Sequence, residues 1–137
     1  MSDAIYGIGT DLIRITRIDK VYRRHPERFP RRLLHPREYA QFQQSARPIN
    51  FLAKSWAAKE AFGKALGTGV RNYDNPEVGV VRGELGRPFI VMSARMRQRL
   101  NDLGVSSAHL SLSDEGGMVM AFVVLERGMF NPPLQSA

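Results

Sequence analysis

Two carboxylates lie at positions where a charged side chain needs compensation. Asp11 follows Gly7 and Gly9 in an alternating strand pattern, so it shares a face with two residues that leave room for a ligand or another backbone. Glu60 lies in the middle of a mostly apolar helical segment, where an unpaired ionised carboxylate would cost free energy. Each carboxylate therefore either pairs with a neighbouring cation or belongs to a binding site.

An ion pair is the simpler explanation for both residues. Asp11 could pair with Arg14, and Glu60 could pair with Lys64 four residues later, an arrangement worth about 0.2–0.5 kcal/mol on an exposed helix. Such a gain does not explain a charge on a buried helix, whereas a metal ion or a phosphate would compensate its burial. Both explanations stay open from the sequence.

The residue types around Glu60 indicate a hard cation and a phosphate. Two carboxylates in a chain without cysteine suit Mg2+, which prefers oxygen ligands and completes its shell with water and phosphate oxygens. Lys59 and Lys64 lie close to Glu60 in the sequence. Backbone amides for a phosphate could come from Gly67, Thr68 and Gly69, although Gly67 is equally well explained as a helix C-cap.

Hydrophobic periodicity predicts the elements that must hold these side chains. Alternation over 4–15 predicts a strand, followed by a helix with a capping box at Thr16 and Asp19. The run from Pro48 to Gly67 predicts a long helix that is apolar around most of its circumference. Further helices are expected at 36–42 and 93–104. Strands are expected at 78–82, 88–92, 109–113 and 118–126.

These elements predict one α+β domain. Glycine-containing turns between the later strands favour antiparallel pairing, so we expect an antiparallel sheet packed on the long buried helix. The domain is expected to cover 1–127. Two prolines follow in the segment 128–137, which is predicted to be a loose C-terminal tail.

The net charge of +7 is confined to one stretch of the chain. Between positions 12 and 37 there are nine basic and two acidic residues, and the remainder is balanced. Helical spacing places Arg17, Lys20 and Arg24 in a row, which indicates a polyanionic or acidic partner. A nucleic-acid-binding module is one alternative, although the chain has no RNP, zinc-finger or KH-like signature. A solvated face is the other.

Composition and hydropathy limit the expected location. The absence of cysteine excludes disulfides and thiolate metal sites, and it fits a reducing compartment. Positions 1–10 lack a basic segment before a long apolar run, so no signal peptide is expected. No apolar stretch approaches the length of a transmembrane helix. We therefore expect a cytoplasmic protein with no membrane partner.

Four segments resemble the holo-acyl carrier protein synthases, the short single-domain type of 4′-phosphopantetheinyl transferase. They are GIGTDLIRITRI at 7–18, FLAKSWAAKEAFGKALGTG at 51–69, ELGRP at 84–88 and HLSLSDE at 109–115. The first two are highly specific in this order and spacing. The resemblance implies the 4′-phosphopantetheinyl transferase fold and a role in fatty acid biosynthesis. It also implies transfer of the 4′-phosphopantetheine arm of coenzyme A to a serine of apo-acyl carrier protein, with release of adenosine 3′,5′-bisphosphate.

The resemblance also implies roles for single residues of the site. Asp11 and Glu60 would hold Mg2+, and Lys64 would lie near the phosphates of coenzyme A. His109, which is otherwise explained as a structural strand histidine, would lie at a coenzyme A site formed between the subunits of a homotrimer. Ser55 stands where some members have a basic residue.

The basic first helix has an implied role as well. In the family this helix docks on the acidic recognition helix of the carrier protein, and the equivalent residues are Arg14, Arg17 and Arg24. The expected partners are therefore coenzyme A and an acidic acyl carrier protein rather than a nucleic acid.

The implied site suggests a mechanism. Mg2+ at the pyrophosphate would neutralise charge as the carrier serine attacks the β-phosphorus, and lysines would stabilise the leaving bisphosphate. Our hypothesis for the general base is Glu60, acting through a water molecule on the metal.

Overall fold

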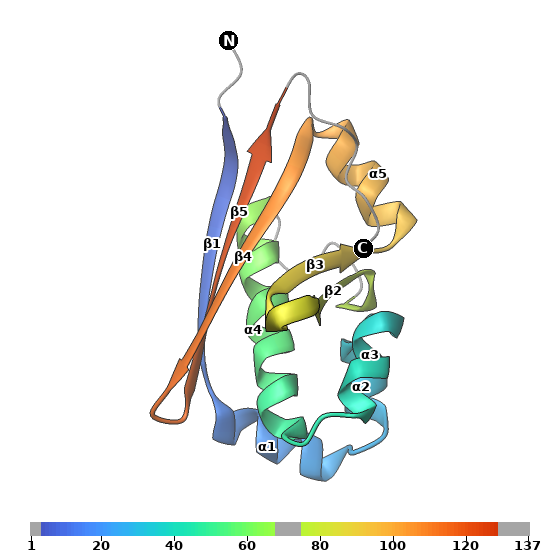
Figure 1. Ribbon diagram of the computed structural model, residues 1–137, viewed down its shortest axis with the longest axis vertical. Coiled ribbons are helices and arrows are strands. Elements are labelled where there is room, and N and C mark those ends of the chain that lie inside the picture. The colour runs from blue at the N-terminus through green and yellow to red at the C-terminus, as the bar shows by residue number, and fades with distance from the viewer. Residues whose placement is uncertain (1–3, 68–74, 129–137) are drawn as a thin grey trace.

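A three-stranded antiparallel sheet and one long helix form the framework of the structure (Figure 1). The computed structural model describes residues 4–67 and 75–128. The strands are β1 (Ile5–Arg14), β4 (Val105–Glu115) and β5 (Met118–Arg127), in the order β1-β5-β4. Helix α4 (Pro48–Leu66) packs on one face of this sheet. The predicted α+β architecture, with an antiparallel sheet on a long buried helix, is confirmed.

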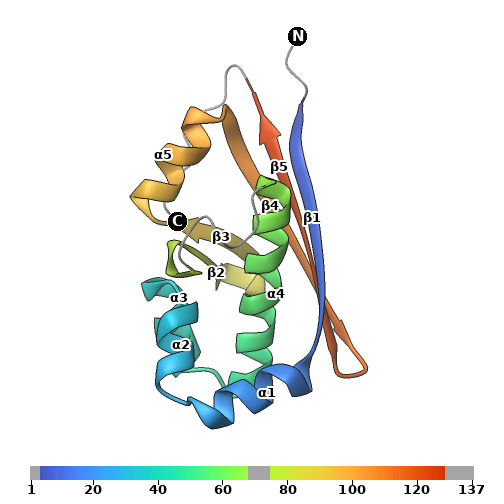
Figure 2. The same ribbon diagram turned by 180° about the vertical axis from the view of Figure 1, so that it is seen from behind.

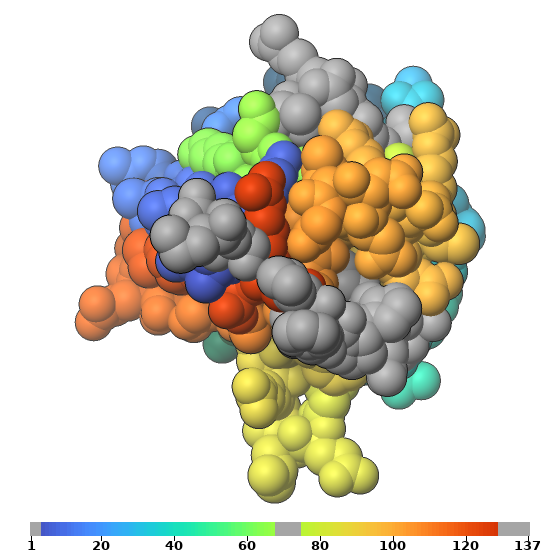
Figure 3. Space-filling model, turned by 90° about the horizontal axis from the view of Figure 1, so that it is seen from above, coloured from blue at the N-terminus to red at the C-terminus, as the bar shows by residue number. Residues whose placement is uncertain are grey.

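A second, smaller sheet lies on the other side of α4. It pairs β2 (Val78–Arg82) with β3 (Pro88–Met92) in antiparallel fashion, with the bounds that the sequence predicted. The 3-10 turns η2 (Asn75–Glu77) and η3 (Glu84–Gly86) precede and follow β2. The connection that contains η3 projects from the body of the molecule, in yellow in Figure 3.

The described residues also form four shorter helices. They are α1 (Ile15–Arg24), α2 (Arg28–Leu33), α3 (Pro36–Gln43) and α5 (Ala94–Asp102). Seen from behind, α1 lies across the N-terminal end of α4, with α2 and α3 alongside (Figure 2). Buried side chains from both sheets and from α1, α2, α4 and α5 form one continuous core.

The contact between β1 and α4 is unusually close because two strand residues have no side chain. A Cβ atom on Gly7 would lie 1.9 Å from the backbone oxygen of Ala65, and one on Gly9 would lie 2.0 Å from that of Ala61. The room beside Asp11 is therefore filled by the backbone of α4, one of the two possibilities that the glycine pattern left open.

The helix boundaries differ from prediction in two places. The predicted capping box at Thr16 and Asp19 is absent: α1 begins at Ile15 without a side-chain cap, and Asp19 pairs with Arg23 at 2.8 Å instead. Helix α2 was not among the predicted elements, since it has six residues and contains Pro30, a residue type that normally indicates a break. Pro30 lies in the first turn of α2, where a backbone N–H has no helical acceptor and its loss costs little.

The predicted extent of the domain, 1–127, stays a prediction. The expected tail lies almost wholly outside the described residues. Within 4–67 and 75–128, no helix combines the length and the apolar character needed to cross a membrane.

Candidate active site

The facing sides of β1 and α4 bring together three charged residues that the sequence singled out. Asp11 lies on the face of β1 that packs against the helix, two residues after Gly9. Lys64 reaches from α4 to the strand, where its Nζ donates to the backbone oxygen of Thr10 at 2.8 Å and lies 3.5 Å from Oδ1 of Asp11. Asp11 is 16% exposed and Lys64 is 56% exposed, so the group is open to solvent on the lysine side.

Glu60 completes this group without the ion pair that its spacing from Lys64 suggested. Among the described residues no cation lies within 4.0 Å of its carboxylate, because Lys64 turns towards β1. Burial raises the pKa of Glu60, and the nearby Asp11 carboxylate raises it further, while Lys64 and Arg17 act in the opposite direction. Glu60 is thus a partly buried carboxylate beside a second carboxylate, and no cation among the described residues contacts it.

This arrangement fits a hard divalent cation. A cation between the carboxylates would compensate both the burial and the repulsion by Asp11 that raise the pKa of Glu60. Asp11 and Glu60 would supply two carboxylate ligands. That number suits Mg2+, which keeps water and phosphate oxygens in its shell.

Lys59 does not join this group, although it precedes Glu60 in the sequence. It is 1% exposed and lies on the opposite side of α4, where its Nζ is 2.9 Å from Oε1 of Glu38 on α3. Successive helix residues point about 100° apart, which separates Lys59 from Glu60. The sequence suggested that Lys59 binds a phosphate of the ligand beside Glu60, and its placement at Glu38 does not fit that role.

The glycine-containing segment after α4 is described only at its first residue. Gly67 ends the helix in the left-handed conformation, with φ of 86°, and its N–H donates to the backbone oxygens of Gly63 and Lys64. The C-cap explanation of Gly67 is therefore confirmed. Thr68 and Gly69 lie outside the described residues, so their predicted contact with a phosphate stays a prediction.

His109 lies away from Asp11, on the outer face of the sheet. It is registered opposite Val124 of β5, which pairs with Ile8 of β1, whereas Asp11 lies on the face covered by α4. The His109 ring contacts the carboxylate of Glu126. It also lines a cavity of about 320 Å³ with Arg87, Pro88, Phe89, Ala108 and Leu110. Within one chain, His109 therefore cannot reach the carboxylate pair.

The predicted docking arginines are exposed around α1, and a neighbouring cavity was missed by sequence reasoning. Arg14, Arg17 and Arg24 all lie at the surface. Beside them, a cavity of about 250 Å³ is lined by Val21, His25, Arg28, Phe29 and Arg32. Val21, an apolar residue, is 36% exposed here. The signal in the sequence that could have indicated this cavity was Phe29, an apolar residue within the basic stretch.

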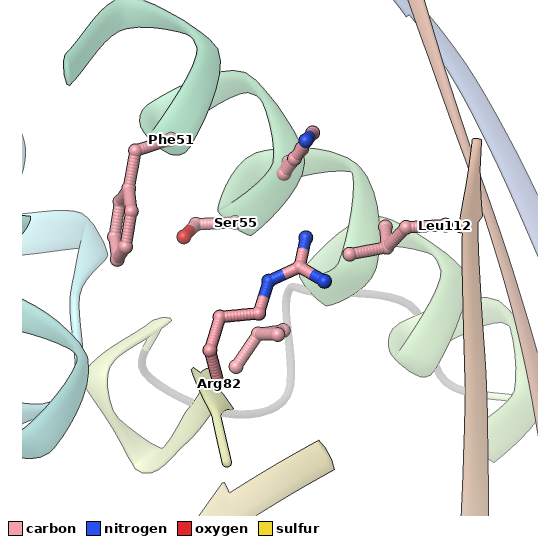
Figure 4. A pocket seen from close by; sticks show the side chains of 6 residues that line it. Phe51, Ser55, Arg82 and Leu112 are labelled. Carbon is pink, nitrogen blue, oxygen red and sulfur yellow. The ribbon is translucent and has the colours of Figure 1, made fainter. Parts of the chain in front are cut away.

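A smaller cavity of about 30 Å³ adjoins Ser55, a position that is basic in some members of the family that the sequence resembles. The Ser55 side chain is buried in α4, and the guanidinium group of Arg82 lies between it and Leu112 of β4 (Figure 4). Lys54 also lines this cavity. Cationic groups are therefore present at this place, from β2 and from α4.

Comparisons with known proteins agree on one family. The model of the 4′-phosphopantetheinyl transferase superfamily matches residues 7–122. A holo-acyl-carrier-protein synthase of Nitrosospira multiformis is 42% identical over 124 residues, which is 90% of this chain and 99% of the relative.

Solved structures of such synthases are similar as well. The enzyme from Neisseria meningitidis superposes with a TM-score of 0.86 at 41% identity, covering 90% of this chain and 99% of the other. The enzyme from Bacillus anthracis, solved in complex with coenzyme A (3′,5′-ADP), has a TM-score of 0.74 at 30% identity and covers 92% and 100%.

Proposed function

The chain belongs to the 4′-phosphopantetheinyl transferase superfamily, and we propose that its reaction takes place where Asp11, Glu60 and Lys64 meet between β1 and α4. The protein is an enzyme that transfers the 4′-phosphopantetheine arm of coenzyme A to a serine of apo-acyl carrier protein. The other product is adenosine 3′,5′-bisphosphate. The comparisons give no support to the alternative of a nucleic-acid-binding module.

We propose that Asp11 and Glu60 hold Mg2+. The observation that carries this proposal is a partly buried Glu60 beside the Asp11 carboxylate: burial raises the pKa of Glu60, and Asp11 raises it further. A bound Mg2+ supplies charge neutralisation at the pyrophosphate of coenzyme A. Lys64, kept near Asp11 by its bond to Thr10, is placed to donate to the leaving bisphosphate.

Glu60 is also our candidate for the general base. Among the described residues no cation contacts its carboxylate, which leaves an oxygen available to accept the proton of the serine hydroxyl, directly or through water. Asp11 is more exposed to the influence of Lys64, at 3.5 Å, and is assigned to metal binding alone.

We propose a homotrimer in which coenzyme A binds between subunits. The outer face of the sheet carries large apolar side chains that the described part of the chain leaves exposed: Ile8 is 59% exposed, Leu12 64% and Met120 42%. Such a contiguous apolar face is typical of a surface that another protein chain covers. His109 lies on the same outer face, so a neighbouring subunit could bring it to the nucleotide of the adjacent site.

The carrier protein is proposed to dock at α1. Arg14, Arg17 and Arg24 present positive charge without a neighbouring surplus of acids, and this suits an acidic helix of the carrier. The cavity that contains Val21 and Phe29 would accept an apolar side chain of that helix. We further propose that the protein acts in the cytoplasm in fatty acid biosynthesis, because that process supplies the carrier and draws on coenzyme A.

A direct assay tests the proposed function. The protein is mixed with coenzyme A, Mg2+ and an apo-acyl carrier protein, and mass spectrometry follows both the arm on the carrier and the released bisphosphate. We expect both products in equal amounts, and their loss when a chelator removes Mg2+. Absence of product with every divalent metal tried would overturn the assignment.

A further inference from the structure

The most deeply buried charges in the described part of the chain form a pair outside the proposed reaction site. Lys59 is 1% exposed and Glu38 is fully buried, and the ammonium nitrogen lies 2.9 Å from the carboxylate. The pair lies between α3 and the side of α4 that faces away from β1. The reaction described above uses neither residue.

Both members of the pair hold backbone groups of other elements. Lys59 also donates to the backbone oxygens of Asn75, at 3.0 Å, and Val78. Glu38 accepts from the backbone N–H of Val80 at 2.8 Å and from that of His35 at 3.1 Å. The pair therefore connects the start of α3, the middle of α4, η2 and β2.

Stability alone is a weak reason for such a pair. Removing two charges from water costs several kcal/mol per ion, so well-packed apolar side chains of similar volume are often about as stabilising. What a buried pair with directed hydrogen bonds provides in addition is a defined position for the elements that carry it.

The position of α4 is set from two sides. On one side α4 contacts β1 through the backbone at Ala61 and Ala65, which lie against Gly7 and Gly9. This contact is so close that a small rotation of the helix changes the distances across it. The pair of Lys59 with Glu38 holds the helix from the side that faces away from β1.

The anchor and the reacting groups are rigidly linked through the helix. Lys59 and Glu60 are consecutive, and Lys64 follows about one turn later, so the rotation of α4 that places Lys59 at Glu38 also directs Glu60 and Lys64 towards Asp11. A small rotation about the helix axis would separate the two carboxylates. Such displacements reduce catalysis strongly.

We propose that Lys59, held by Glu38, is a positioning residue that sets the rotation of α4 and thereby the distance between the Glu60 and Asp11 carboxylates. The proposal rests on the proposed function of these carboxylates as the Mg2+ site. It predicts that loss of the pair changes the response to Mg2+ in a folded enzyme, without changing docking of the carrier on α1.

The test uses the variant Glu38→Gln with Lys59→Met, which removes both charges while it keeps side-chain volume and part of the hydrogen bonding of residue 38. Circular dichroism and the thermal midpoint establish that the variant is folded. We expect the Mg2+ concentration for half-maximal activity to rise about 10- to 100-fold and kcat to fall, with the KM for the carrier within about twofold of wild type. Arg95→Met, an exposed change on α5, is the matched control.

A folded double variant with the wild-type Mg2+ response would overturn the proposal. If the double variant does not fold, Glu38→Gln alone is measured in the same way, because it keeps the size of the side chain and removes only its charge; a smaller shift in the same direction supports the proposal, and none contradicts it. Asp11→Asn separates this proposal from the proposed function. If that change leaves the Mg2+ response unaltered, the assignment of the metal site itself is wrong.

Discussion

Asp11 and Glu60 share one nearby ammonium group, that of Lys64, and this shortage of positive charge distinguishes the site from a structural ion pair. An exposed pair would leave both pKa values near their ordinary range and contribute little. Here Lys64 binds Thr10 and lies near Asp11, and the pKa of Glu60 is raised by burial and by Asp11. A bound cation would compensate the burial of Glu60 and its repulsion by Asp11.

Glu60→Gln examines the two roles proposed for this residue. The amide keeps the shape but loses both metal affinity and basicity, so we expect kcat to fall by about 10²-fold or more. Turnover is measured over a series of Mg2+ concentrations, and binding of Mn2+, which is paramagnetic, is measured separately. Metal binding that is retained together with undiminished turnover would exclude Glu60 as the base. Asp102→Asn, on α5, serves as the control.

His35 introduces a pH dependence of stability at the start of α3. Its Nδ1 accepts from the backbone N–H of Arg37 at 3.1 Å, which requires the unprotonated nitrogen. Burial lowers the pKa of His35, Lys59 and Arg37 lower it further, and Glu38 opposes the change. The neutral form is therefore favoured in the folded state.

Acidification is expected to destabilise the protein through this residue. Since the pKa is below its ordinary value of 6.5 in the folded state, the unfolded chain binds the proton more readily. The contribution of His35 is complete above about pH 6.5 and is lost as the pH falls through the folded-state value. His35→Ser keeps a capping oxygen that does not titrate, so urea unfolding between about pH 5 and pH 8 should show a smaller slope of free energy with pH. An equal slope in both proteins would contradict this expectation.

Single residues were predictable where their environment is local. The carboxylate pair followed from a strand pattern and a helix pattern, and the C-cap at Gly67 followed from its type and position. The partner of Lys59 did not follow, because Glu38 lies on another helix and only the packing of α3 on α4 brings them together. The direction of the Lys64 side chain could not be predicted either. From its place on the helix it could reach Glu60 on the same helix or a residue on a neighbouring strand.

At the scale of elements, the close contact of β1 and α4 makes the site sensitive to small changes. Gly9→Ala would place a Cβ atom 2.0 Å from the backbone oxygen of Ala61, so the helix must move. We expect a loss of about 1–3 kcal/mol of stability, measured by urea unfolding, together with a raised Mg2+ requirement. Asn101→Ala, an exposed change on α5, should have little effect. Unchanged stability in Gly9→Ala would show that the helix adjusts freely.

Elements were predicted well when their signals were long or paired. Helix α4 has a proline at its start, a glycine after its end and apolar residues between them, and β2 and β3 have clear turn residues on both sides. Helix α2 was missed because six residues give too short a period, and Pro30 normally indicates a break. The start of α1 was predicted wrongly because the Asp19 side chain pairs with Arg23 instead of capping the helix backbone.

At the scale of the whole molecule, the net positive charge lies at one end. The basic residues of α1 and α2 lie at one end of α4, next to the cavity that contains Phe29, whereas the remainder of the chain is neutral in sum. The sequence located the charge but not the cavity, because Val21 and Phe29 meet only when α1 and α2 pack at an angle.

Reversal of charge at α1 tests whether this end receives the carrier. In the variant Arg17→Glu with Arg24→Glu we expect the KM for the carrier to rise about tenfold or more, and the KM for coenzyme A to stay within about twofold. Arg95→Glu, on the exposed side of α5, controls for the change in net charge. Equal effects on both substrates would mean that the basic surface is not the docking site.

The separation of Asp11 and His109 on opposite faces of one sheet yields a prediction about assembly. If each site combines Asp11 of one subunit with His109 of the next, then Asp11→Asn and His109→Ala chains are each impaired alone but complement one another. Unfolded together and refolded as a mixture, they should regain activity at roughly one quarter of the sites under random association. The assay compares the mixture with each variant refolded alone, and light scattering reports the mass of the assembly. If the activity of the mixture never exceeds the sum of the separate variants, Asp11 and His109 do not act together at a site between subunits.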